Sequence, residues 1–132
     1  MRKNRKYLIK LIQTGSKLQK YVAQSILKRI GCYSIKSYLS DVINHGCVSG
    51  MVCGLISYTE TNDFFLKYQE EINEFLFESL DSHGFAGLAE LFGDRWKTED
   101  PLALSVYNRN LLAWFVYEQT CYQIANELGF EI

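Results

Sequence analysis

The sequence predicts an all-α protein, a single compact helical domain of five to seven helices over residues 1–132. Apolar residues recur every three or four positions through most of the chain, which is the spacing of one buried helix face. Glycines that can end a helix, and Ser, Thr, Asn or Asp residues that can start one, stand between these segments. A length of 132 residues, with 48% hydrophobic and 22% charged residues, fits one globular core.

Three helices are expected in the N-terminal third, each between a capping residue and a glycine. They cover roughly 5–13 between Asn4 and Gly15, 17–30 between Ser16 and Gly31, and 35–45 between Ser34 and Gly46. A helix of about ten residues is marginal by itself in water. We therefore expect the first helix to dock through the apolar face formed by Tyr7, Leu8, Leu11 and Ile12.

The segment 47–57 is apolar and rich in small residues. As a helix it would present Gly50 and Gly54 four positions apart, which would allow another backbone to approach closely. A short buried strand remains the alternative, because periodicity does not separate the two structures in so short a run.

The second half of the chain predicts one long amphipathic helix, a short helix and a long C-terminal helix. They cover 62–82 after a Thr61 cap, 85–92 before Gly93, and the stretch from an Asp100-Pro101 start to about Leu128 before Gly129. Proline suits the first position of a helix because the N–H group that it lacks would have no helical partner there.

Charge divides the chain into basic N-terminal helices, 1–36, and an acidic helical body, 37–132. Residues 1–40 contain ten Lys and Arg and no acid, whereas 41–132 contain four Lys and Arg and all fifteen Asp and Glu. This asymmetry predicts an electrostatic partner. Attraction between the two halves of the fold is the alternative explanation.

A basic face follows from lysines that recur at three- and four-residue spacing in the first two helices. Its candidate residues are Lys3, Lys6, Lys10, Lys17, Lys20, Lys28 and Arg29. Such a face can bind phosphates by displacing counterions, with little reading of base sequence. The alternatives are a solvated helix surface or a docking surface for the acidic half.

An acidic face follows from carboxylates along one side of the expected helix 62–82. Its candidate residues are Asp63, Glu70, Glu71, Glu74, Glu78 and Asp81. Each four-residue step rises ~6 Å, which is comparable with phosphate spacing along a nucleic-acid strand. Like charges four residues apart repel, so the face is interpreted as a partner-binding surface that imitates nucleic acid. Simple solubility remains the alternative.

No motif in the sequence indicates catalysis. The chain has no Gly-x-Ser-x-Gly elbow, no phosphate-binding glycine loop and no dinucleotide fingerprint. The cysteines, at 32, 47, 53 and 121, form no Cys-x-x-Cys pair, and His45 and His83 stand alone. We therefore expect no enzyme activity, no catalytic residue, no metal site and no cofactor, and we interpret the cysteines as buried free thiols in a reducing cytoplasm.

Glu118 is the acid that falls on an apolar helix face, at the spacing 111, 114, 118, 121 and 125. A half-buried carboxylate needs a partner or it takes up a proton. A polar clasp between helices is favoured over a general base, and both interpretations stay open from the sequence.

Several segments together resemble a family of small uncharacterised proteins carried by bacteriophages and other mobile elements. They are Asn-His-Gly-Cys-Val-Ser-Gly-Met-Val at 44–52, Leu-Ile-Ser-Tyr at 55–58, Leu-Leu-Ala-Trp-Phe at 111–115 and Ile-Ala-Asn-Glu-Leu-Gly at 124–129. The resemblance covers roughly residues 40–129 and implies neither an activity nor site residues. It implies a context in which small non-enzymatic proteins bind a host protein, including anti-CRISPR and anti-restriction inhibitors.

The expected function is therefore stoichiometric inhibition of a host defence nuclease, in the manner of an anti-CRISPR protein. The expected partner is the nuclease or its nucleic-acid complex. The alternative is a small nucleic-acid-binding or regulatory protein that uses residues 2–36, and a packaging accessory subunit is a third hypothesis. No apolar run approaches the ~20 residues of a membrane span, so we expect a soluble protein in the cytoplasm of a bacterial host, without a membrane partner.

Overall fold

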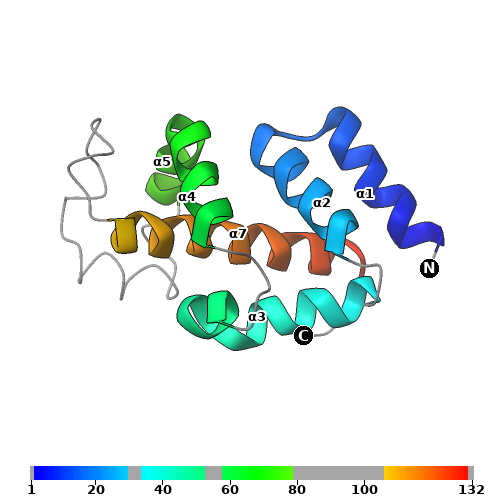
Figure 1. Cartoon of the computed structure of the whole chain (residues 1–132). Coiled ribbons are helices and arrows are strands. Elements are labelled where there is room, and N and C mark those ends of the chain that lie inside the picture. Colours follow the sequence, from blue (N-terminus) through cyan, green and yellow to red (C-terminus); the bar gives the residue numbers. More distant parts are fainter. Residues whose placement is uncertain (1, 30–33, 53–57, 79–105, 131–132) are drawn as a thin grey trace. The chain divides into compact units, whose positions relative to one another are not determined.

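The computed structural model describes residues 2–29, 34–52, 58–78 and 106–130 (Figure 1). These residues form helices and no strand, which confirms the predicted all-α class. The helices are α1 (Arg2–Thr14), α2 (Lys17–Arg29), α3 (Ile35–Val52), α4 (Tyr58–Lys67), α5 (Gln69–Glu78) and α7 (Val106–Glu127). No helix in the described part of the chain combines the length and the apolar character needed to cross a membrane.

The chain divides into two compact units. The first unit comprises Met1–Leu55 and Tyr117–Ile132, and the second comprises Ile56–Val116. α1, α2 and α3 therefore belong to the first unit, and α4 and α5 to the second. α7 contributes its C-terminal half to the first unit and its N-terminal half to the second. The charge boundary at residue 36 lies inside α3 and does not coincide with this division.

The predicted starts of α2 and α3 are confirmed by their hydrogen bonds. The backbone N–H of Gln19 donates to Ser16 Oγ at 3.2 Å, and the backbone N–H of Ser16 donates to Gln19 Oε1 at 2.9 Å. This reciprocal pair is a capping box, with Gln in the third helical position. At the start of α3 the backbone N–H of Ser37 donates to Ser34 Oγ at 3.0 Å. Each cap satisfies a backbone donor that the helix itself leaves unpaired.

Docking of the first helix is also confirmed. α1 packs along α2 (Figure 1). The inner face of α1 buries Leu8 and Leu11. Asn4 lies within α1 and does not precede it, because the helix begins at Arg2. The core of the first unit is completed by buried residues of α2, α3 and α7, among them Val22, Ala23, Ile26, Leu39, Val42, Cys121, Ile124 and Ala125.

The predicted end of the third helix at Gly46 is wrong, because α3 continues through this glycine to Val52. A glycine inside a helix costs only about 1 kcal/mol relative to alanine, and it ends a helix where the chain must turn with positive φ. Gly46 has no such backbone conformation. The helical interpretation of 47–57 is thereby confirmed for residues 47–52, and 53–57 lie outside the described residues.

The predicted helix 62–82 is wrong as a single element. Its described part belongs to two helices, α4 and α5, which meet at Tyr68. The Tyr68 N–H donates to the Phe64 carbonyl at 3.1 Å and the Ile72 N–H donates to the Tyr68 carbonyl at 2.8 Å, so helical bonds reach the junction from both sides. Tyr68 also meets Phe64 edge to face, with ring centroids 5.8 Å apart. No glycine or proline marks the break in the sequence.

Thr61 is not a helix cap, because α4 begins three residues earlier and buries it completely. Its hydroxyl donates instead to Oδ1 of Asn110 on α7, within the second unit. The core around this bond consists of Phe64, Phe65, Ile72, Leu76, Leu111, Leu112 and Trp114. The expected helix 85–92, the residues 79–82 and the Asp100-Pro101 helix start lie outside the described residues.

The central part of α7 is buried on every side. Residues 109–117 are nine consecutive buried positions, although the spacing 111, 114, 118, 121 and 125 predicted only one apolar face. A helix that is buried all round is typical of a protein core. The helix ends as predicted at Gly129, which has a φ of 77°. The Phe130 N–H donates to the Ala125 carbonyl at 2.9 Å and the Gly129 N–H donates to the Asn126 carbonyl at 3.0 Å, which together form a Schellman motif.

Replacement of Gly129 tests this helix end. A Cβ atom at Gly129 would meet nothing within 4 Å, so only the left-handed backbone opposes a side chain there. We expect Gly129→Ala to lower the free energy of unfolding by about 1–2 kcal/mol, and Gly129→Asn to lower it less, because asparagine tolerates this conformation. Urea denaturation of the three proteins measures the difference. Equal midpoints for wild type and the Ala variant would contradict it.

Candidate functional site

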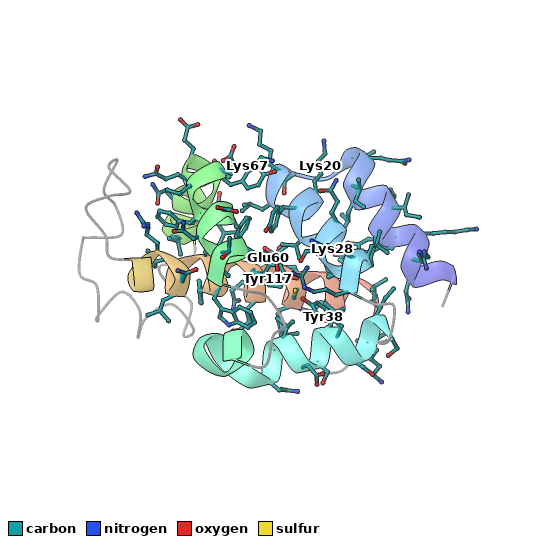
Figure 2. All side chains as sticks on the ribbon, viewed as in Figure 1. Lys20, Lys28, Tyr38, Glu60, Lys67 and Tyr117 are labelled. Carbon is teal, nitrogen blue, oxygen red and sulfur yellow. The ribbon has the colours of Figure 1, made fainter. Side chains whose placement is uncertain are left out.

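The first unit carries lysines on the outer sides of α1 and α2. Four of them are exposed, and we call these the basic surface: Lys6, Lys10, Lys17 and Lys28. Lys20 is half-buried, and the side chain of Lys3 lies outside the described residues (Figure 2 labels Lys20 and Lys28). Arg5, which the sequence analysis did not include, is exposed on α1 as well.

Arg29 was expected on the basic face but is half-buried and bonded to its own helix. Its Nη1 donates to Ser25 Oγ at 2.7 Å and to the Ser25 carbonyl at 3.2 Å. Residues four apart lie on the same side of a helix, and Ser25 lies on the buried side of α2. The position of Ser25 therefore draws the guanidinium of Arg29 away from the exposed lysines.

The second unit carries the acidic candidates on two helices. Glu70, Glu74 and Glu78 are exposed and share one side of α5, and we call this the acidic face of α5. Ile72 and Leu76 are buried on the other side of the helix. The break at Tyr68 separates this face from exposed Asp63, which lies on α4.

The two remaining acidic candidates do not join the acidic face of α5 in the same way. Glu71 is half-buried, and Asp81 lies outside the described residues. The nearest lysine in the sequence, Lys67 at the end of α4, places its ammonium group 5.4 Å from the centroid of the Tyr68 ring. This distance is within the range of a cation–π contact.

Several charges on both surfaces have no partner within the part of the chain that the structure describes. There, no carboxylate lies within ion-pair distance of Lys6, Lys10 or Lys28. Over the same residues, no Lys or Arg side chain pairs with the carboxylates of Glu70, Glu74 or Glu78.

Charge is sorted between the two units. The sequence of the first unit has ten Lys and Arg against four Asp and Glu, a net charge of +6. The second has four Lys and Arg against eleven Asp and Glu, a net charge of −7. The C-terminal segment, which carries Glu118, Glu127 and Glu131, belongs to the basic unit. The overall charge of −1 therefore conceals two strongly and oppositely charged bodies.

A chain of hydroxyl groups lies inside the first unit. The hydroxyl of Tyr117 on α7 is 2.7 Å from the hydroxyl of Tyr38 on α3 and 2.9 Å from Ser25 Oγ on α2. Arg29 donates to the same serine oxygen, so this hydrogen-bond network also includes a half-buried guanidinium. We call these four residues the tyrosine cluster (Figure 2 labels Tyr38 and Tyr117). It joins three helices that are far apart in the sequence.

No pattern in the sequence indicated the tyrosine cluster. A serine on an otherwise apolar helix face is the signal that could have indicated it, because a buried hydroxyl group needs a hydrogen-bond partner. The identity of that partner, Tyr117 on a distant helix, depends on the tertiary fold.

Burial controls the acid–base behaviour of the cluster. It raises the pKa of Tyr117 well above its ordinary value, and the negative charges that Cys121 and Tyr38 would carry raise it further. The hydrogen bond from Ser25 acts in the opposite direction. Burial also raises the pKa of the Cys121 thiol, with a smaller contribution from the charge of Glu118. Both groups therefore stay neutral near pH 7 and are poor nucleophiles.

The structure also describes Glu118 and one of the four cysteines that the sequence singled out. Glu118 is half-buried, as its spacing predicted, and Cys121 is a buried free thiol. The side chains of the other three cysteines lie outside the described residues. Within the described part of the chain, no three His, Cys, Asp or Glu residues come together as metal ligands.

The fold and the charged surfaces define an all-α protein of two compact units with opposite net charge. A family model described as a domain of unknown function (DUF7222) matches residues 16–130, and the chain therefore belongs to this family. No curated protein and no solved structure matches it. The matched region contains Lys17, Lys28 and the acidic face of α5, whereas Lys6 and Lys10 precede it.

The tyrosine cluster predicts how stability depends on alkaline pH. Because the folded-state pKa of Tyr117 is raised, its contribution is fully present below the ordinary pKa of tyrosine, about 10, and is lost as pH rises above it. We expect this group alone to lower the free energy of unfolding by up to about 1.4 kcal/mol per pH unit in that range. Urea denaturation between pH 8 and pH 11 measures the slope.

Tyr117→Phe separates this effect from general alkaline unfolding. The variant lacks the titrating hydroxyl, so its stability should fall less steeply above pH 10, although it should be less stable at pH 7 by about 1–3 kcal/mol because Ser25 and Tyr38 lose a partner. Tyr122→Phe is the matched control, since Tyr122 is exposed on the same helix. Identical alkaline slopes for Tyr117→Phe and wild type would contradict the assignment.

Proposed function

We propose that this protein inhibits a host defence nuclease by stoichiometric binding, as an anti-CRISPR-type accessory protein of a phage or mobile element. The observation that carries the proposal is the acidic face of α5, where Glu70, Glu74 and Glu78 are exposed on one side of a helix. The proposed mechanism is occupation of the nuclease's nucleic-acid channel, with no catalytic step performed by this chain.

The spacing of the glutamates suits this role. Successive carboxylates are four residues apart, and each step rises ~6 Å along the helix axis. Like charges at this spacing destabilise an isolated helix by a few tenths of a kcal/mol per pair. No Lys or Arg side chain of the described residues pairs with them. A row of like charge on one side of a helix supports binding to a positively charged partner.

The net charge of the second unit, which contains α5, also supports the proposal. With eleven acids against four bases, the second unit creates a negative field that extends beyond any single side chain. Channels that hold nucleic acid are lined by Lys and Arg, so the field is complementary to them and accelerates association. Ile72 and Leu76, buried on the opposite side of α5, hold the acidic face on a packed helix.

The resemblance to small proteins of phages and mobile elements supplies the class of partner. In that context a small protein without an enzyme motif acts on a host protein, and nucleases that defend against foreign DNA are such proteins. The electrostatic argument by itself supports a nucleic-acid-binding partner. The resemblance to proteins of phages and mobile elements favours a defence nuclease among such nucleic-acid-binding partners.

Reversal of the α5 charges tests the proposal. Purified CRISPR effector and restriction nucleases are titrated with this protein and assayed for DNA cleavage. For the target nuclease, we expect activity to fall linearly and reach zero near one inhibitor per enzyme. Glu70→Lys, Glu74→Lys and Glu78→Lys together should abolish inhibition. The fold should survive, because exposed substitutions change stability by about 0.5 kcal/mol or less each.

The control variant reverses three lysines of the basic surface, with Lys6, Lys10 and Lys17 changed to Glu. It should inhibit as wild type does. Circular dichroism confirms that both triple variants are folded. Full inhibition by the folded α5 variant would overturn the proposed contact. An inhibitor concentration for half-maximal inhibition that does not change with enzyme concentration at a fixed amount of DNA, but rises in proportion to the DNA, would indicate that the protein sequesters DNA and does not bind the enzyme.

A further inference from the structure

α1 and α2 form a packed helical hairpin that presents lysines on its outer sides. The chain turns between the helices at Gly15 and Ser16, where the capping box fixes the start of α2. The turn is tightly packed, since a Cβ atom at Gly15 would lie 2.6 Å from the Leu11 carbonyl oxygen. Buried Leu8 and Leu11 hold the inner side of α1. The lysines of the basic surface therefore stand on a fixed scaffold.

The charge of this hairpin is of one sign. Neither α1 nor α2 contains an Asp or Glu, and the first unit as a whole has a net charge of +6. Lys6, Lys10 and Lys28 have no carboxylate partner among the described residues. Six of the nine Lys and Arg in these two helices are lysines. A lysine ammonium group acts as a point charge, which suits phosphates better than the edges of bases.

The uncharged side chains of the hairpin narrow the choice of polyanion. Its two aromatic residues, Tyr7 and Tyr21, are half-buried, so no exposed ring is available for stacking the bases of a single strand. Ile9 is the one large hydrophobic residue that the described part of the hairpin exposes. An anionic membrane would need a continuous apolar helix face, and a single exposed isoleucine does not supply one.

We infer that the basic surface of α1 and α2 binds the phosphate backbone of duplex nucleic acid without reading its sequence. This activity goes beyond the proposed nuclease inhibition, because it uses a different unit and needs no nuclease. The four lysines displace condensed counterions from the duplex, which supplies the binding free energy and makes affinity fall with added salt. With four phosphate contacts the slope of log K against log salt is about −4.

Fluorescence anisotropy with labelled 20-base-pair DNA of two unrelated sequences tests the inference. The full chain is titrated onto each duplex and onto one separated strand, at NaCl concentrations between 50 and 200 mM. We expect equal affinity for the two duplexes, weaker binding of the single strand and a slope near −4. Sedimentation with phosphatidylserine vesicles measures the membrane alternative, for which we expect no binding.

Two double variants of equal charge change locate the surface. In Lys6→Glu/Lys10→Glu the reversals lie on α1, and in the matched control Lys36→Glu/Lys67→Glu they lie on exposed positions of α3 and α4. The α1 variant should lose at least tenfold in duplex affinity, and the magnitude of its salt slope should fall by about two. The control should change affinity less than threefold. Circular dichroism checks that both variants fold.

Each contrary result overturns the inference. Equal losses in the two double variants would assign binding to net charge, and preference for one duplex sequence would assign it to base recognition. Tighter binding of the single strand or of vesicles would replace the duplex as partner, and no binding at 50 mM NaCl would remove the activity. The triple α5 reversal should retain duplex binding, so this inference and nuclease inhibition can fail independently.

Discussion

Complete burial of the middle of α7 is the constraint on which the structure depends. Nine consecutive residues, 109–117, are removed from solvent, and both compact units take part of their core from this one helix. Polar groups on a helix buried on every side gain by pairing internally, because an unpaired buried polar group costs about 1–3 kcal/mol. Asn110 accepts from Thr61 in the second unit, and Tyr117 meets Ser25 and Tyr38 in the first. Within each unit, these bonds determine which helices pack against α7.

The sorting of charge follows from which segments each unit contains. The first unit combines the acid-free helices α1 and α2 with the end of α7, and it remains basic despite Glu118 and Glu127. The second unit contains α4, α5 and most of the acids. Opposite net charge on the two units is consistent with two different partners. In the proposed contacts, α5 binds a protein surface built for nucleic acid, and α1 with α2 bind nucleic acid itself.

The chemistry of the interior is consistent with a binding role. The Tyr117 hydroxyl and the Cys121 thiol, the buried groups with strongly raised pKa values, are held neutral by their surroundings. A neutral thiol and a neutral phenol stabilise a core and are weak nucleophiles. The exposed lysines and glutamates, by contrast, lie on helices whose opposite sides are packed. Rigid presentation of charge favours fast and electrostatically steered association.

The sequence by itself determined the helical class, the caps at Ser16 and Ser34, the C-terminal stop at Gly129 and the outward direction of most charges. These features depend on interactions within a few residues, which a one-dimensional pattern records. Only the tertiary structure decided that α3 passes through Gly46 and that a break at Tyr68 divides the acidic run. It also decided the partnership of Tyr38 with Tyr117 and the assignment of the C-terminal segment to the basic unit. Such outcomes depend on contacts between residues distant in the chain, where packing of the core outweighs local preference.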